Sequence, residues 1–255
     1  MDDLIQQGHY ARKQIGCDSG LISWSHRRRF LVGVRLAQAL AGQRVLDYGC
    51  GDGTFLALLM SSPARPKTAT GAEIDARLVE QTRARFQGVA GLGFVHNDEL
   101  ERPGHTGAYD GVVCMEVLEH VVDRERALAL FERLLAPGGM LLVSVPVETG
   151  LPLLVKQIMR RIAGWRGLGD YPGTSGYTTR ELMASVFAGP RQHITRPLHR
   201  QADGFESHDH KGFNWMLLRE QIRARFDLLQ TLSSPVAWLP PHLGSQAWFV
   251  ARKRS

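Results

Sequence analysis

Apolar and polar positions follow one another along the chain in blocks typical of an α/β protein. Five short apolar runs predict buried strands, at 44–49, 68–75, 92–98, 109–115 and 140–146. Between these runs, apolar residues recur at helical spacing and predict helices, at 26–41, 54–60, 76–86 and 124–135. Because strands and helices that alternate in this way form right-handed βαβ units, the sequence predicts a parallel sheet with helices on both faces.

The composition is that of a globular chain with one sizeable core, since 44% of the 255 residues are hydrophobic and 22% are charged. No apolar run reaches about 18 residues, so we expect no membrane-spanning helix. The amino terminus has two acids and no apolar stretch, which argues against a secretory signal. Cys17, Cys50 and Cys114 form no CxxC pair, which indicates a reducing compartment and a cytoplasmic protein.

The net charge of +6 and the pI of about 9.5 invite a nucleic acid or an anionic membrane as partner. The basic residues are scattered, however, and runs of three occur at 27–29 and 252–254 alone. A mildly basic enzyme is therefore the simpler interpretation.

The first predicted strand runs into a glycine-rich segment at 47–53, DYGCGDG. Its pattern is GxGxG, and Thr54 stands where a dinucleotide fingerprint needs its third glycine. Asp47 and Asp52 flank the loop and would repel a pyrophosphate, but they suit a ligand with positive charge. S-adenosylmethionine is such a ligand, because it has an ammonium, a sulfonium and no phosphate. The alternative is a turn with structural glycines.

Acidic residues and one methionine stand at the ends of the next predicted strands. Glu73 lies 24 residues after Gly49, near the offset at which an acid meets ribose hydroxyls. Asp75 competes for this role, but we expect it to cap the following helix. Asp98 follows the third strand, where it would accept the exocyclic amine of adenine or cap a turn. Met115 ends the fourth strand and would cover the adenine ring or pack in the core.

Five segments in this order resemble the class I S-adenosylmethionine-dependent methyltransferases: VLDYGCGDGTF, GAEID, the acid of HND, YDGVVCMEVLEHV and LLAPGGMLLVSVP. The CMEVLEHV segment is most similar to the branch that includes ubiquinone-pathway O-methyltransferases and broad small-molecule methyltransferases. The resemblance implies a Rossmann-like, doubly wound, mostly parallel seven-stranded sheet and S-adenosylmethionine as cofactor. The strand ends and the resemblance together predict these cofactor-binding residues: Arg29, Asp47, Gly49, Cys50, Gly51, Gly53, Glu73, Ile74, Asp98, Glu99, Cys114 and Met115.

Arg29 enters this set through the resemblance, since in that branch an arginine upstream of the first glycine holds the carboxylate of the cofactor. Arg27, Arg28 and Arg35 compete for the role. The chain lacks an Asn-Pro-Pro-Tyr-like segment after the fourth strand, and no proline precedes Cys114. The resemblance therefore disfavours a nucleic acid as the substrate.

A minimal member of this family follows the fifth strand with one helix and two strands, here 213–226, 226–233 and 245–253. Residues 148–207 are then an insertion that we expect to form a helical lid over the acceptor site. This divides the chain into an N-terminal segment, a cofactor-binding core, the lid and a C-terminal completion of the core, at 1–25, 26–147, 148–207 and 208–255.

Two helices are predicted within the insertion. The segment 151–166 is amphipathic, contains basic residues and has no acid. Such a helix can lie on an anionic bilayer, or it can close over the active site with a solvated basic back. The segment 177–187 begins with a Thr178-x-x-Glu181 capping box.

Two groups of residues are candidates for the chemistry of the acceptor. Glu116, Glu119 and His120 have the spacing of one helical face, where they would bind a divalent metal, provide His120 as base, or form a helix-start network. His208 and His210 alternate in an extended segment and would be bases, ligands or a solvated loop. We predict His120, His210 and Glu119 as catalytic residues and do not favour a resident metal.

The sequence thus predicts an S-adenosylmethionine-dependent methyltransferase that acts on oxygen in a small-molecule or lipid-linked acceptor. We expect a cytoplasmic protein with peripheral contact to the inner membrane surface through 151–166. Two alternatives stay open. One is a regulatory module that binds the cofactor without turnover, because no base is unambiguous. The other is an RNA methyltransferase, because the chain is basic.

Overall fold

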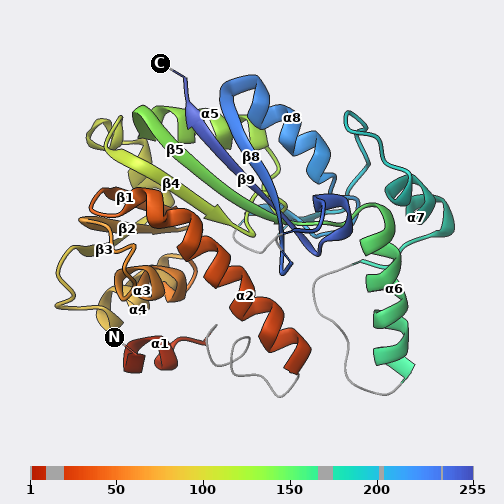
Figure 1. Cartoon of the computed structure of the whole chain (residues 1–255), viewed down its shortest axis with the longest axis horizontal. Helices are drawn as coiled ribbons and strands as arrows, with labels where there is room; N and C mark the ends of the chain where they lie inside the picture. The colour runs from red at the N-terminus through yellow and green to blue at the C-terminus, as the bar shows by residue number, and fades with distance from the viewer. Residues whose placement is uncertain (1, 10–19, 166–174, 201–203, 237, 255) are drawn as a thin grey trace.

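The computed structural model describes residues 2–9, 20–165, 175–200, 204–236 and 238–254. Its centre is a seven-stranded sheet in the order β3-β2-β1-β4-β5-β9-β8 (Figure 1). The strands are β1 Arg44–Tyr48, β2 Thr68–Glu73, β3 Leu92–His96, β4 Tyr109–Met115, β5 Leu135–Pro146, β8 Phe226–Ser234 and β9 Gln246–Lys253. The first five are parallel, and β9 is antiparallel to both of its neighbours. The predicted Rossmann-like sheet is confirmed.

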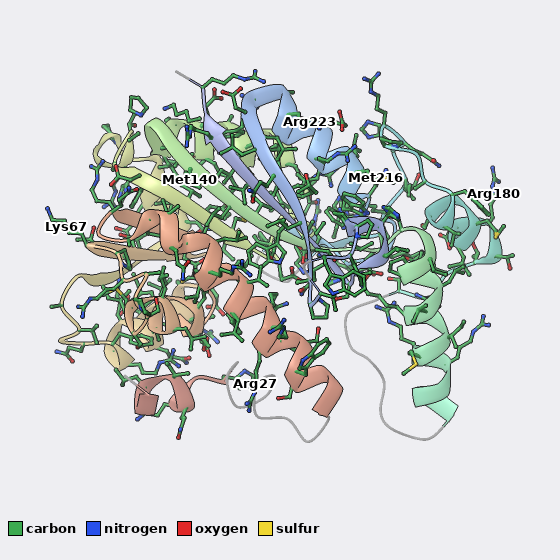
Figure 2. All side chains as sticks on the ribbon, in the orientation of Figure 1. Arg27, Lys67, Met140, Arg180, Met216 and Arg223 are labelled. Atoms are coloured by element: carbon green, nitrogen blue, oxygen red, sulfur yellow. The ribbon has the colours of Figure 1, made fainter. Side chains whose placement is uncertain are left out.

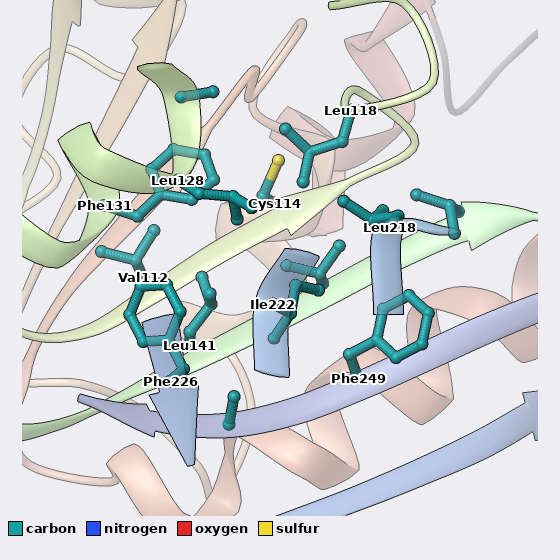
Figure 3. Close-up of a cluster of buried hydrophobic side chains, with 14 of the residues drawn as sticks. Val112, Cys114, Leu118, Leu128, Phe131, Leu141, Leu218, Ile222, Phe226 and Phe249 are labelled. Carbon is teal, nitrogen blue, oxygen red and sulfur yellow. The ribbon is translucent and has the colours of Figure 1, made fainter. Parts of the chain in front are cut away.

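Helices cover both faces of this sheet. One face packs against α2 Gly20–Leu36, α3 Thr54–Met60 and α4 Ala76–Arg85. The other packs against α5 Arg124–Leu134 and α8 Trp215–Arg225. Figure 3 shows the second layer, in which Phe131 and Leu128 of α5 and Ile222 of α8 meet the side chains of β4 and β5. These three side chains are fully buried, so they contribute to the hydrophobic stabilisation of the domain.

Polar side chains fix where several helices begin. The Asp75 carboxylate accepts hydrogen bonds from the backbone of Arg77 and Leu78, as predicted for the cap of α4. Asp123 and Asn214 cap α5 and α8 in the same way. Each cap satisfies amides that the helix itself cannot, and is worth about 1 kcal/mol.

Two predicted boundaries are wrong. The first predicted helix begins at 26, but the N-terminal segment 1–25 contains α1 Asp2–Gln7 and the start of α2. Leu4 and Ile5 of α1 pack against the core layer under α2 and α3, a tertiary contact that the local pattern does not reveal. The fifth strand begins at Leu135, directly after α5, so the segment 137–139 does not separate the two elements. It interrupts the pairing of β5 with β4 instead.

The insertion lies beyond the body of the sheet. It contains α6 Gly150–Trp165 and α7 Thr179–Val186, close to the predicted helices, and the capping box of Thr178 and Glu181 is confirmed. A short hairpin of β6 Leu198–Arg200 and β7 Glu206–His208 was not predicted. Figure 1 shows α6 extending away from the sheet, with α7 beside its first turns. Among the described helices, none has the length and apolarity that a membrane span requires.

Candidate functional site

A cavity of about 170 Å³ opens at the carboxyl ends of β1 and β4. This is the point at which the order of the parallel strands reverses, where doubly wound sheets bind their ligands. The cavity is lined by the glycine-rich loop, the end of β4 and one face of α2, through Arg29, Phe30, Asp47, Gly49, Cys50, Gly51, Asp52, Thr54, Phe55, Met115 and Glu116. Six of the predicted cofactor residues are in this set.

Backbone conformation explains the glycines of the loop. Gly49, Gly51 and Gly53 have φ angles of 74°, 54° and 73°, which side chains with a Cβ rarely adopt. A Cβ on Gly49 would also lie 2.3 Å from Cγ2 of Val117. Since the Gly49 amide donates to the carbonyl of Ala72 on β2, the loop is held against the sheet and leaves the crevice beside it open.

Acidic groups determine the electrostatics of the cavity. Asp47 is buried, and burial together with the nearby Glu73 raises its pKa to about 8. Asp52 accepts hydrogen bonds from the amide and the hydroxyl of Thr54, at 3.1 and 2.7 Å. A buried carboxyl with a raised pKa gains from a cationic ligand and loses from an anionic one. The cavity therefore fits a sulfonium or an ammonium better than a phosphate.

Glu73 lies beside the loop rather than in the wall of the cavity. Its Oε2 accepts a hydrogen bond from the Gly51 amide at 2.9 Å, and its Oε1 accepts one from the Ile74 amide at 2.7 Å. A carboxylate has capacity for further donors in addition to these. Glu73 is thus placed at the end of β2 next to the loop, and its contact with a ribose stays a prediction.

An ion pair lines the other side of the cavity. Nη1 of Arg29 lies 3.2 Å from Oε2 of Glu116, and Arg29 is 5% exposed whereas Arg27 and Arg28 are exposed. Ser144 and Gln246 also donate to the Glu116 carboxylate, at 3.0 and 3.3 Å. The two charges match the amino-acid end of S-adenosylmethionine, with a guanidinium for its carboxylate and a carboxylate for its ammonium. The residues of the cavity therefore fit this cofactor.

The other predicted cofactor residues are not in the cavity wall. Gly53 begins α3 and faces the Phe94 ring, and Cys114 is fully buried in the core. Ile74 is 45% exposed, and the Asp98 side chain is exposed. Glu99 completes a capping box in its own turn. For these residues, contact with the cofactor stays a prediction.

The two predicted groups for acceptor chemistry meet in one place. The rings of His120 and His210 are 4.9 Å apart, at 65° to each other, although 90 residues separate them in sequence. Oε1 of the buried Glu119 lies 3.9 Å from Nε2 of His120. The segment 116–120 is a turn after β4, so the helical face expected there is wrong. The turn nonetheless brings Glu119 and His120 to the same edge of the sheet.

A backbone contact determines the tautomer of His120. Its Nδ1 lies 2.8 Å from the carbonyl oxygen of His208, and its own carbonyl accepts the His208 amide at 3.0 Å. Because a carbonyl can only accept, Nδ1 carries the hydrogen, and Nε2 of the neutral ring keeps its lone pair. His208 directs its Nδ1 to the carbonyl of Pro197, at 2.8 Å. Thus His120, rather than His208, is the partner of the His210 ring.

Burial disfavours the charged forms of Glu119 and His210. It raises the pKa of Glu119 well above its ordinary value, with a further contribution from Glu116, and it lowers the pKa of His210. Neither carboxyl oxygen of Glu119 has a hydrogen-bond partner in the described part of the chain. The ligand atoms of Glu119, His120 and His210 lie within 4.8 Å of one another, a spacing that a divalent cation can also bridge. The cluster can therefore accept a proton or, as the alternative, bind a metal.

Glu148 is a site residue that the sequence analysis missed. It is buried just beyond β5, and its Oε1 lies 2.7 Å from Nζ of Lys156 and 4.0 Å from Nδ1 of His210. Arg160 approaches the same oxygen at 4.0 Å. The expectation that the basic residues of α6 form a solvated back is thus wrong for Lys156 and Arg160, which turn toward the site. The signal in the sequence that could have revealed Glu148 is an acidic residue shortly after an apolar strand.

The fold and the site together define a doubly wound α/β protein with a cavity suited to a cationic ligand at its switch point. Residues 23–195 match a family model described as a methyltransferase domain, so the chain belongs to this family. The resemblance to class I S-adenosylmethionine-dependent methyltransferases is therefore confirmed, and S-adenosylmethionine is the cofactor of this class.

Curated relatives match the chain over its cofactor-binding part. A probable S-adenosylmethionine-dependent methyltransferase of Mycolicibacterium smegmatis is 37% identical over 120 residues, which are 47% of this chain and 44% of the relative. A ubiquinone biosynthesis O-methyltransferase of Pectobacterium carotovorum is 38% identical over 106 residues, 40% of this chain and 43% of the relative. The chain thus spans less than half the length of these relatives.

Solved structures share the fold along the whole chain. PH0226 from Pyrococcus horikoshii superimposes with a TM-score of 0.61, at 12% identity, over 96% of both chains. The N-methyltransferase NodS of Bradyrhizobium japonicum, in complex with S-adenosyl-L-homocysteine, gives a TM-score of 0.54 at 14% identity over 100% of both chains. At such identities the likeness concerns the fold alone.

Proposed function

We propose that this protein transfers the methyl group of S-adenosylmethionine to an oxygen of a small-molecule or lipid-linked acceptor, with His120 as general base. The observation that carries the proposal is the hydrogen bond from Nδ1 of His120 to the His208 carbonyl, because it leaves Nε2 available to take a proton. Curated relatives named O-methyltransferases support the choice of oxygen over nitrogen.

When bound, S-adenosylmethionine supplies an electrophilic methyl group on its sulfonium. Arg29 and Glu116 hold its amino-acid end, and Asp47 lies at the β1 end of the same cavity. Nε2 of His120 accepts the proton of the acceptor hydroxyl, a contribution of about 10²–10⁴-fold for a well-placed base. The neutral His210 ring packs against His120 and limits its orientation.

The decisive experiment compares His120→Ala with His242→Ala. His242 is exposed in the short 3₁₀ helix Pro241–Leu243 before β9 and serves as the matched control. S-adenosylhomocysteine release is measured with a panel of phenols, with and without an alkyl tail. We expect His120→Ala to lower kcat by about 100-fold or more and to leave the affinity for S-adenosylhomocysteine unchanged.

Unchanged turnover of His120→Ala would contradict the proposal. Cofactor binding without turnover on any acceptor would instead favour the regulatory module. Retention of RNA on a filter with a steep salt dependence would favour the RNA methyltransferase.

The proposals of a lipid-linked acceptor and of a membrane contact are based on the exposed apolar face of α6. Leu151, Val155, Ile158 and Met159 share one side of the helix and are 51–57% exposed. Ile162 and Trp165, which the sequence places on the same stripe, have side chains outside the described residues. A helix that presents an apolar stripe can enter the boundary between headgroups and acyl chains.

Charge supports the same surface. Residues 150–200 hold eight of the 31 lysines and arginines but two of the 25 acidic residues. Lys156, Arg160 and Arg196 turn inward, whereas Arg161, Arg180 and Arg191 are exposed. Figure 2 shows Arg180 on α7, on the side of the insertion away from the sheet. Basic side chains around an apolar stripe favour an anionic bilayer over a neutral one.

The test is co-sedimentation with vesicles of phosphatidylglycerol and phosphatidylcholine, compared with phosphatidylcholine alone. We expect binding to the anionic vesicles, and a loss of several-fold for the double variant Ile158→Ser with Met159→Ser. Leu31→Ser is the control, because Leu31 is 59% exposed on α2. Equal binding of the double variant and the wild type would exclude α6 as the contact.

A further inference from the structure

Arg196 reaches from the insertion to the two backbone segments that hold the imidazole pair. Its Nη2 donates to the carbonyl of Glu119 and, at 2.6 Å, to the carbonyl of Asp209. Its Nε lies 3.4 Å from the carbonyl of Lys211. The guanidinium rests over the ring of the buried Phe213, 5.2 Å from the ring centroid. One side chain thus joins the turn after β4 to the segment before α8.

The two carbonyl groups that accept from Nη2 of Arg196 lie next to His120 and His210 in the chain. Glu119 and Asp209 directly precede His120 and His210, so Arg196 binds the peptide groups that carry both rings. The reciprocal hydrogen bonds between His120 and His208 join the same two segments a residue further on. Together these contacts fix the separation of the two rings and the carbonyl that sets the tautomer of His120.

We propose that Arg196 is a positioning residue for methyl transfer, which holds His120 in the orientation and tautomer that leave Nε2 as the base. This inference rests on the proposed function, since it assigns a role relative to His120. A guanidinium suits the task because its planar set of donors can bridge two carbonyl groups at once. The ammonium of a lysine is a compact charge on a flexible stem and cannot hold the same planar geometry.

Kinetics of Arg196→Ala and Arg196→Lys provide the first test. We expect kcat to fall by about tenfold to 100-fold in Arg196→Ala, because small misplacements of a catalytic group are costly, while the affinity for S-adenosylhomocysteine stays within about twofold. Arg196→Lys should retain part of the activity. The control is Arg200→Ala on the same hairpin, since Arg200 is exposed and pairs with Glu206.

Spectroscopy provides a readout that needs no acceptor. Long-range ¹H–¹⁵N correlation spectra distinguish the two tautomers of a neutral imidazole. We expect His120 to have its hydrogen on Nδ1 in the wild type and to show a mixture of tautomers in Arg196→Ala. Millimolar guanidinium should partly restore both the tautomer and the turnover. Arg196→Lys gives the same comparison if Arg196→Ala does not fold.

The outcomes separate this inference from the proposed function. If His120→Ala is inactive while both Arg196 variants keep the wild-type kcat and the wild-type tautomer, the positioning role is wrong and the base stands. If His120→Ala retains full turnover, the base itself is wrong, and the role of Arg196 falls with it. A lower kcat together with a changed tautomer of His120 in Arg196→Ala supports both the proposed base and the positioning role of Arg196.

Discussion

Binding of S-adenosylmethionine should become tighter as the pH rises from 6 to 8, and Asp47 should be the cause. This carboxyl is buried at the end of β1 in the wall of the cavity, and its pKa is raised to about 8 by burial and by Glu73. It is therefore mostly neutral at pH 6 in the free protein. A ligand with one net positive charge favours the ionised form, so binding must release the proton.

The magnitude follows from the pKa. With a value of about 8, roughly 1% of Asp47 is ionised at pH 6 and about half at pH 8, so the dissociation constant should fall by up to about 50-fold. The stability of the free protein should change in the opposite sense. The pKa of Asp47 in the folded protein lies above its ordinary value of 3.8. Asp47 therefore contributes its full stabilisation below pH 3.8, and this contribution to the free energy of unfolding is lost as the pH rises to 8.

Isothermal titration calorimetry at several pH values, in two buffers with different ionisation enthalpies, measures both the affinity and the number of protons released. Asp47→Asn is the control, because it cannot ionise and reports any titration of the ligand itself. The reasoning is refuted if the wild type and Asp47→Asn show the same dependence of affinity on pH, or if no proton leaves the wild-type protein on binding at pH 6.5.

Three further outcomes test the core and the site. A Cβ on Gly71 would lie 2.6 Å from Phe94 and 2.7 Å from Cys50, so Gly71→Ala should lower the free energy of unfolding by about 1–3 kcal/mol in urea titrations. Phe131→Ala should lower it by about 3–5 kcal/mol, since the ring is fully buried between α5 and the sheet. Dialysis against EDTA should leave kcat within about twofold if Nε2 of His120 is the proton acceptor. Loss of activity that Mg²⁺ or Zn²⁺ restores would point to a cation in that cluster.

The parts of the fold that local sequence determines were predicted. Strands that are buried on both faces read as continuous apolar runs, and the helices between them show their own period. Asp75 and the Thr178 capping box mark helix starts by contacts within a few residues, and these are confirmed. The acid and glycines after β1 lie at the switch point because parallel strands place their carboxyl ends at one edge.

The parts that depend on tertiary contacts were not predicted. The start of β5 at Leu135 follows from pairing with β4 opposite Tyr109, which overrides the turn-forming residues that come next. Lys156 turns inward because the buried Glu148 attracts it, and helical periodicity contains no information on that partner. The contact of His120 with His210 joins two segments 90 residues apart, so each sequence pattern showed half of the site.

The reciprocal hydrogen bonds between His120 and His208 have a consequence for chimeric enzymes. The His120 imidazole is contributed by the turn after β4, whereas its alignment is contributed by the segment that follows the insertion. A graft that exchanges acceptor preference between two methyltransferases should therefore transplant residues 148–211 as a unit. A cut at 207 would separate Arg196 of the insertion from the carbonyl groups of His208 and Asp209, with which it aligns His120.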